Sequence, residues 1–318
     1  MGRRQAYLIP LAALVLAAAP RAQVARKGMV VDWSAPAMFI EGEPYPVRVK
    51  LRVPEVDLPP VPTWMLTPSA FIVDGRLLGK RNASLVIEAQ PGQVFTAEFD
   101  MGSVILASES FAKRDFRLRY GDDRGARILE VGFLKSAEKG IEFRELPAAQ
   151  LKDYQVVLRT SRGDLWLELW PHVAPNHVRH FLDLCYTGFY DGSKFHRVIP
   201  TYMIQAGAAA QREVGPQVLE PEFSTRRHVP GVISMAPAGE NGRAGDEFFI
   251  MHGVAPSLDG RHSAFGQLVG GLDIVDAIAN SGNKSYEPSD ERAYKPPVDQ
   301  TILKAIVVRA PKRIREGE

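Results

Sequence analysis

Short runs in which apolar and polar residues alternate dominate residues 24–140. In the run 45–53 the apolar residues lie on one side of an extended chain and the basic residues on the other: Val47, Val49, Leu51 and Val53 against Arg48, Lys50 and Arg52. A period of two is that of a β-strand with one buried face. Four similar runs follow, at 70–73, 84–87, 94–99 and 116–120. Turn residues such as Asp74-Gly75 separate them, so the pattern predicts an antiparallel β-sandwich.

These residues contain no histidine and no group of side chains arranged for catalysis. We therefore interpret 24–140 as an accessory or binding domain, whose partner the sequence does not name. The polar stretch 141–153 is expected to be a linker, and 154–310 a second domain. The basic and acidic residues of 311–318 indicate a solvated tail.

The first 23 residues have a different pattern. Arg3 and Arg4 precede an apolar run over 6–19, which ends in small residues at Ala17 to Ala19. This is the layout of a secretory signal peptide, and the run is shorter than the roughly 20 residues that span a bilayer. We expect an exported protein, periplasmic or extracellular, without a stable membrane span. An uncleaved membrane anchor is the alternative.

From residue 154 the apolar positions predict a hairpin around a turn at 161–164. A helix begins near Pro175, with Val178, Phe181, Leu182 and Cys185 at helical spacing. The chain's one cysteine, Cys185, falls on that apolar stripe, so we expect a buried small hydrophobe rather than a reactive thiol. One cysteine excludes an intrachain disulfide and a cysteine-based zinc site.

Composition narrows the function further. The chain has 318 residues, 45% hydrophobic and 24% charged, with a formal net charge of +2. Basic residues are interleaved with acidic ones, which gives no case for nucleic-acid binding. His177 and His180 are three residues apart, but no third ligand accompanies them. We expect surface histidines there, and neither a metal site nor a cofactor.

The densest candidate chemistry lies in 195–207, Phe-His-Arg-Val-Ile-Pro-Thr-Tyr-Met-Ile-Gln-Ala-Gly. In an extended strand, Arg197 and Ile199 point to the same side. An arginine that shares a surface with large apolar side chains suits a mostly apolar substrate that needs one directed hydrogen bond.

This motif, with Met203, Gln205 and Gly207, resembles the signature of cyclophilins, the peptidyl-prolyl cis-trans isomerases. Further segments resemble cyclophilin landmarks in the family's order, at 188–192, 231–236, 248–250, 258–262 and 271–278. The resemblance covers 154–310. It implies a closed eight-stranded antiparallel β-barrel capped by two helices, with a packed interior and a site on the outer face.

The implied reaction is rotation about an X–Pro bond, against a barrier near 18–20 kcal/mol. It needs a donor that favours the twisted amide, not a nucleophile or metal. Arg197 fits this role because its guanidinium is always charged. By resemblance, Gln205 and His262 complete the catalytic set, and proline-containing polypeptides are the partners. The resemblance implies a substrate pocket formed by Tyr202, Met203, Ala236, Phe249 and Leu258.

Three positions depart from the family pattern. Pro237 stands where asparagine is usual and offers no N–H; Glu247 replaces glutamine; Ser257 replaces tryptophan. Ser257 predicts poor binding of cyclosporin-type ligands. Two hypotheses follow: an isomerase that assists folding of exported proteins, or a weakly active or inactive module that binds proline-containing segments.

Overall fold

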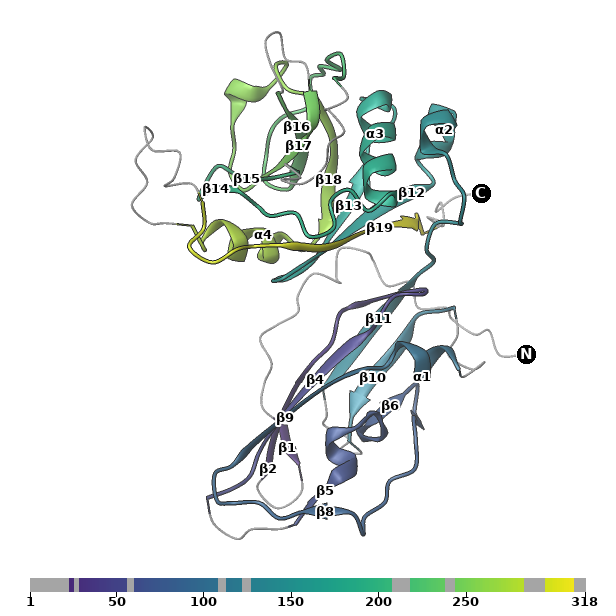
Figure 1. Cartoon of the computed structure of the whole chain (residues 1–318), viewed down its shortest axis with the longest axis vertical. Coiled ribbons are helices and arrows are strands. Elements are labelled where there is room, and N and C mark those ends of the chain that lie inside the picture. The colour runs from purple at the N-terminus through teal and green to yellow at the C-terminus, as the bar shows by residue number, and fades with distance from the viewer. Residues whose placement is uncertain are drawn as a thin grey trace, which may run out of the picture. The chain divides into compact units, whose positions relative to one another are not determined.

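The computed structural model describes residues 23–25, 29–55, 60–107, 113–121, 127–207, 218–237, 244–282 and 295–311 (Figure 1). The chain divides into two compact units, Met1–Lys135 and Ser136–Glu318. The predicted signal peptide, apart from Gln23, and residues 312–318 of the tail lie outside the described residues. Among the described helices, none is long and apolar enough to cross a membrane.

The first unit contains two larger sheets. One has the order β1 (Gln23–Ala25), β2 (Met29–Ser34), β4 (Pro46–Arg52) and β9 (Val94–Asp100). The other has the order β3 (Met38–Ile40), β11 (Ile128–Leu134), β10 (Phe116–Tyr120), β6 (Phe71–Val73) and β7 (Arg76–Leu77). Smaller elements are the strand pair β5 (Val61–Pro62) and β8 (Val86–Ile87), helix α1 (Gly102–Leu106), and the 3-10 helices Thr63–Leu66 and Pro68–Ala70.

The two larger sheets share one core. Val47 and Leu51 of β4 are fully buried in the same hydrophobic cluster as Phe71 and Leu118 of the other sheet. The basic residues between them on β4 are exposed, so the alternation correctly gives the buried face of this strand. The sheets are not purely antiparallel, however, because β3 pairs with β11 in parallel.

The second unit is built on one eight-stranded antiparallel sheet. Its order is β14 (Arg197–Ile199), β15 (Met203–Ala206), β17 (Ala244–Met251), β16 (Val232–Pro237), β18 (Ala264–Gly270), β13 (Gly163–Leu169), β12 (Tyr154–Thr160) and β19 (Ile302–Arg309). The predicted hairpin is confirmed, since β12 pairs with β13 in antiparallel register.

The expectation of a closed barrel is wrong. The sheet is curled but open, with β14 and β19 as its edges (Figure 1). Ahead of β14, residues 192–195 are hydrogen-bonded to residues 300–302 around an antiparallel bridge between Lys194 and Thr301. Strand β14 has only three residues, because Pro200 lacks an N–H and Thr201 takes a left-handed conformation with φ 61°. In the antiparallel register of that bridge, β14 would lie opposite residues 296–298, ahead of β19, so the two edge strands do not pair.

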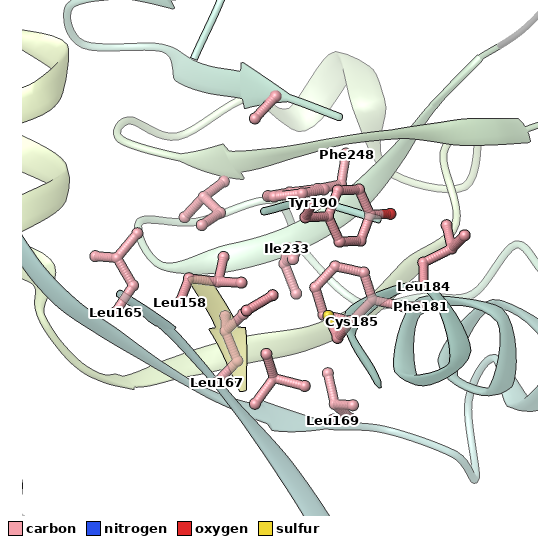
Figure 2. Close-up of a cluster of buried hydrophobic side chains, with 14 of the residues drawn as sticks. Leu158, Leu165, Leu167, Leu169, Phe181, Leu184, Cys185, Tyr190, Ile233 and Phe248 are labelled. Atoms are coloured by element: carbon pink, nitrogen blue, oxygen red, sulfur yellow. The ribbon is translucent and has the colours of Figure 1, made fainter. Parts of the chain in front are cut away.

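Helices α3 (Pro175–Tyr186) and α4 (Leu272–Ala279) pack against this sheet (Figure 1). Figure 2 shows Phe181 and Cys185 of α3 among Leu167, Ile233 and Phe248 of the strands. Cys185 is buried, as predicted, and burial raises the pKa of its thiol. The interior of the curled sheet is thus filled by side chains, which places any substrate site on its other face.

The prediction that His177 and His180 are surface histidines is wrong, because both are buried. His177 Nδ1 lies 2.6 Å from Glu222 Oε2, and His180 Nε2 lies 2.8 Å from Asp246 Oδ1. Each imidazole is buried with its own carboxylate, which offsets the loss of water. No group of potential ligands that could hold a metal occurs among the described residues.

The expected linker 141–153 belongs structurally to the second unit. It contains a 3-10 helix, Phe143–Glu145, and α2 (Ala148–Leu151). Phe143 and Leu151 are fully buried in the same core as α3. Only these two side chains anchor the segment to the core in this way, and the residues around them are mostly polar. The sequence of 141–153 therefore looks like that of a linker.

Candidate functional site

The strand alternation of the second unit separates an inner face from an outer face. On β15, Ile204 and Ala206 enter the interior core, while Met203 belongs to a second hydrophobic cluster. On β17, Phe248 and Ile250 face inward and Phe249 joins Met203. Because the period of a strand is two, Gln205 and Glu247 share the outer face with these two side chains. The outer face therefore carries both apolar and polar candidate residues.

Arg197 and Gln205 are brought together by the β14–β15 hairpin, where they are directly opposed. Arg197 Nη1 donates to Gln205 Oε1 at 3.3 Å. The turn between the strands is held by His252, whose Nδ1 accepts from the Thr201 N–H at 2.9 Å. A Cβ at Gly253 would collide with the Thr201 carbonyl oxygen, so only glycine allows the turn at Thr201 to pack this closely against residue 253.

Glu247 extends this polar contact. Gln205 Nε2 donates to Glu247 Oε2 at 2.6 Å, and His196 Nε2 lies 3.5 Å from the same oxygen. Within the described residues, the partners of Glu247 are Gln205 and His196 rather than Arg197. The hydrogen bond with His196, supported by that from Gln205, lowers the pKa of Glu247 against the opposing effect of burial.

The predicted pocket residues form one cluster. Met203, Ala236, Phe249 and Leu258 are buried together, and Tyr202 packs against them half-buried. Ile199, Val232 and Met251 belong to the same cluster. Gln205 and Phe249 are Cα partners across β15 and β17, so the apolar cluster and the polar contact to Arg197 adjoin.

His262 borders this cluster. Its ring meets that of Phe249 edge to face, with centroids 5.7 Å apart and planes inclined by 80°. Its backbone N–H donates to the Leu258 carbonyl at 3.1 Å. Burial, together with the nearby His228, lowers the pKa of the His262 imidazole from 6.5. The side chain at the rim is therefore neutral at pH 7.

A supporting group escaped the sequence reasoning. His228 is buried, with Nδ1 2.9 Å from Asp259 Oδ1 and Nε2 2.8 Å from Ser234 Oγ. Asp259, His228 and Ser234 are thus connected in the same order as the aspartate, histidine and serine of a serine hydrolase. Ser234 is fully buried, however, and cannot reach a substrate. The residues are distant in sequence and no local motif links them, so the chain offers no signal for their association.

The three residues that depart from the cyclophilin pattern, Pro237, Glu247 and Ser257, lie at different places in the second unit. Pro237 ends β16 and is exposed, as is Ser257 beside the buried Leu258. Glu247 is half-buried on β17. Residues 238–243, between β16 and β17, lie outside the described residues.

Comparison with known proteins identifies the family of the second unit. The family described as cyclophilin type peptidyl-prolyl cis-trans isomerase/CLD matches residues 155–306, within the second unit. A peptidyl-prolyl cis-trans isomerase of Synechococcus elongatus is 44% identical over 130 residues, which cover 40% of this chain and 89% of that protein. The peptidyl-prolyl cis-trans isomerase-like 3 of Gallus gallus is 33% identical, with 49% and 96% covered. This chain belongs to the cyclophilin-type peptidyl-prolyl cis-trans isomerase family.

Other relatives are much longer than the shared region. The peptidyl-prolyl cis-trans isomerase CYP71 of Arabidopsis thaliana is 39% identical over 162 residues, but the match covers only 24% of that protein.

A cyclophilin structure from Cryptosporidium parvum is 26% identical and superposes with a TM-score of 0.44, covering 50% of this chain and 99% of the other.

Proposed function

We propose that the second unit catalyses cis–trans isomerisation of X–Pro bonds, with Arg197 as the principal catalytic residue. The main support for this proposal is the position of Arg197. Its side chain is hydrogen-bonded to Gln205, which adjoins the hydrophobic cluster that contains Met203 and Phe249. A proline ring is apolar and its amide nitrogen has no proton. A site for it therefore needs an apolar surface with one adjacent donor.

The chemistry follows from the bond itself. A planar amide delocalises its nitrogen lone pair, and twisting the bond returns that pair to nitrogen. A donor aimed at the nitrogen gains strength only in the twisted state, so it lowers the barrier without tightening ground-state binding. Arg197 supplies a permanently charged donor. Met203, Phe249 and Leu258 receive the proline ring, and His262, with Tyr202, borders it.

Gln205 binds Arg197 through its oxygen and thereby directs the guanidinium. Ala236 lines the neighbouring groove for the residues that flank the proline. Because Glu247 contacts Gln205 and His196 rather than Arg197, it does not withdraw the guanidinium from a substrate. This arrangement favours the isomerase over the module that only binds proline-containing segments.

The test is isomerisation of a short X–Pro peptide by the purified full chain and by an Arg197→Ala variant. Loss of one preorganised donor costs about 10²–10³ in rate, so we expect at least a hundredfold fall in kcat/KM with the fold intact. Arg144→Ala is the control, because that side chain is 59% exposed and its ion pair is with Asp183 of α3. No catalysis by the parent protein, with proline peptides still bound, would identify a recognition module instead.

We also propose that the protein acts on exported polypeptides. The support is the sequence of residues 1–23, whose basic start, apolar run and small residues are those of a signal peptide. Expression of the full chain in a bacterial host, followed by fractionation and mass spectrometry of its N-terminus, tests this. A chain processed near Ala19–Ala22 in the periplasm is expected, and an unprocessed chain in the cytosol contradicts the proposal.

A further inference from the structure

We propose that Glu247 is a positioning residue that holds the Gln205 amide in one orientation, with its oxygen toward Arg197. The inference rests on the proposed isomerase function. It concerns a position at which this chain carries a carboxylate in place of the glutamine usual in its family.

The contacts around Gln205 are chemically asymmetric. Its nitrogen donates to Glu247 Oε2 at 2.6 Å, and its oxygen accepts from Arg197 Nη1 at 3.3 Å. A carboxylate only accepts hydrogen bonds and a guanidinium only donates them. Rotating the amide by 180° would place oxygen against carboxylate and N–H₂ against guanidinium. Both contacts would then be repulsive, so Glu247 and Arg197 together exclude the reversed amide.

A neutral amide at position 247 would lack this selectivity. Glutamine carries both a donor and an acceptor, so it can pair with either end of the Gln205 side chain. Gln205 would then spend part of its time with N–H₂ toward Arg197, and the hydrogen bond between Arg197 Nη1 and Gln205 Oε1 would be lost for that time. The carboxylate thus restricts the arginine through an intermediate residue, without touching it.

The surroundings keep Glu247 in the required state. His196 Nε2 lies 3.5 Å from the oxygen that accepts from Gln205. The pKa of Glu247 is lowered by these two partners, which keeps the carboxylate ionised at neutral pH. The neighbouring Asp246 is occupied elsewhere, with His180 on α3 at 2.8 Å.

Kinetics in two backgrounds test the inference. Glu247→Gln is expected to lower kcat for an X–Pro peptide about threefold to tenfold, which lies within the range of coupling between contacting residues, with KM nearly unchanged. In a Gln205→Ala background the same substitution should change kcat by less than about twofold, because the residue through which Glu247 acts is gone. Glu145→Gln, an exposed glutamate on the 3-10 helix 143–145, controls for the loss of one negative charge.

Two kinetic outcomes overturn the inference. An unchanged kcat in Glu247→Gln alone would show that orientation of Gln205 does not limit the rate. An equal fall in both backgrounds would show that Glu247 acts on Arg197 or the substrate directly.

A readout independent of activity separates this inference from the proposed function. The side-chain N–H₂ signals of Gln205, identified by their absence in Gln205→Ala, should lie downfield in the ¹⁵N–¹H spectrum of the parent protein. They should move on acid titration with a midpoint below 4.5, the ordinary value from which the pKa of Glu247 is lowered. Signals that do not respond overturn the positioning role, whether or not the protein isomerises peptides. If the signals titrate but no catalysis is found, the proposed function fails alone.

Discussion

The imidazole of His228 stacks against the ring of Phe249, with centroids 6.1 Å apart and planes inclined by 23°. Phe249 is the aromatic residue of the proposed proline pocket, and His228 is held by Asp259 and Ser234. A buried and hydrogen-bonded ring thus supports the pocket wall from behind. The wall is therefore fixed by residues that the substrate does not touch.

His228→Leu is expected to destabilise the protein by about 2 kcal/mol, because the buried Ser234 hydroxyl would lose its partner. Urea unfolding at pH 7 measures this. His172→Leu, an exposed histidine in the same unit, should change stability by less than about 0.5 kcal/mol. Equal effects of the two substitutions would show that the buried hydrogen bonds carry no special weight.

Glu222 is expected to make stability depend on pH. Burial raises the pKa of Glu222, but hydrogen bonds from His177 and from the backbone N–H groups of Asn176 and His177 outweigh it, so the pKa falls below 4.5. Its contribution is then complete above pH 4.5 and is lost as the pH falls through the folded-state pKa. Glu222→Gln should cost about 2 kcal/mol at pH 6.

That cost should shrink at pH 3.5, where urea unfolding of the parent and the variant is compared again. The exposed Glu145→Gln provides the matched control at both values. A cost that stays constant between pH 6 and pH 3.5 would show that the folded state does not favour the ionised form of Glu222.

Features that depend on a short local segment could be predicted from the sequence, whereas features that depend on packing between distant segments could not. Arg197 and Gln205 oppose each other within one short hairpin, and the family resemblance, carried by that local segment, led us to expect both in the site. Burial of His177 and His180 depends on Glu222 and Asp246, which are 45 and 66 residues away in the chain. The open sheet depends on the register in which the segments ahead of β14 and β19 meet. Neither the burial of these histidines nor the opening of the sheet produces a periodic pattern of apolar residues in the sequence.

The pH profile of catalysis should reflect His262. Burial and His228 lower the pKa of its imidazole below 6.5, so the neutral ring persists as the pH falls past that value. We expect kcat/KM at pH 6.5 to remain above half of its value at pH 8, and to fall to half only in more acidic solution. In His262→Asn any part of the decline that is due to this imidazole should vanish. A parent profile that is already half-reduced at pH 6.5 would contradict the assignment.

Ser257 should weaken binding of cyclosporin-type ligands. It is exposed next to Leu258, where the family's usual tryptophan would add a large apolar wall. Ser257→Trp is expected to increase affinity at least about tenfold, since a tryptophan buries 150–250 Å² of surface. Calorimetric titration of both proteins measures this, with Ser257→Ala as the control. Tight binding by the parent protein would show that the missing wall is unimportant.

Pro237 should limit capture of the substrate backbone more than the chemical step. It ends β16 at an exposed position and has no N–H to donate. Pro237→Asn restores a donor worth about 0.5–1.5 kcal/mol, so we expect KM for a proline peptide to fall about twofold to tenfold with kcat unchanged. Pro237→Ala should give most of the same gain, because it also restores the N–H but not the asparagine side chain. If only the asparagine variant gained, the side chain rather than the backbone would be responsible.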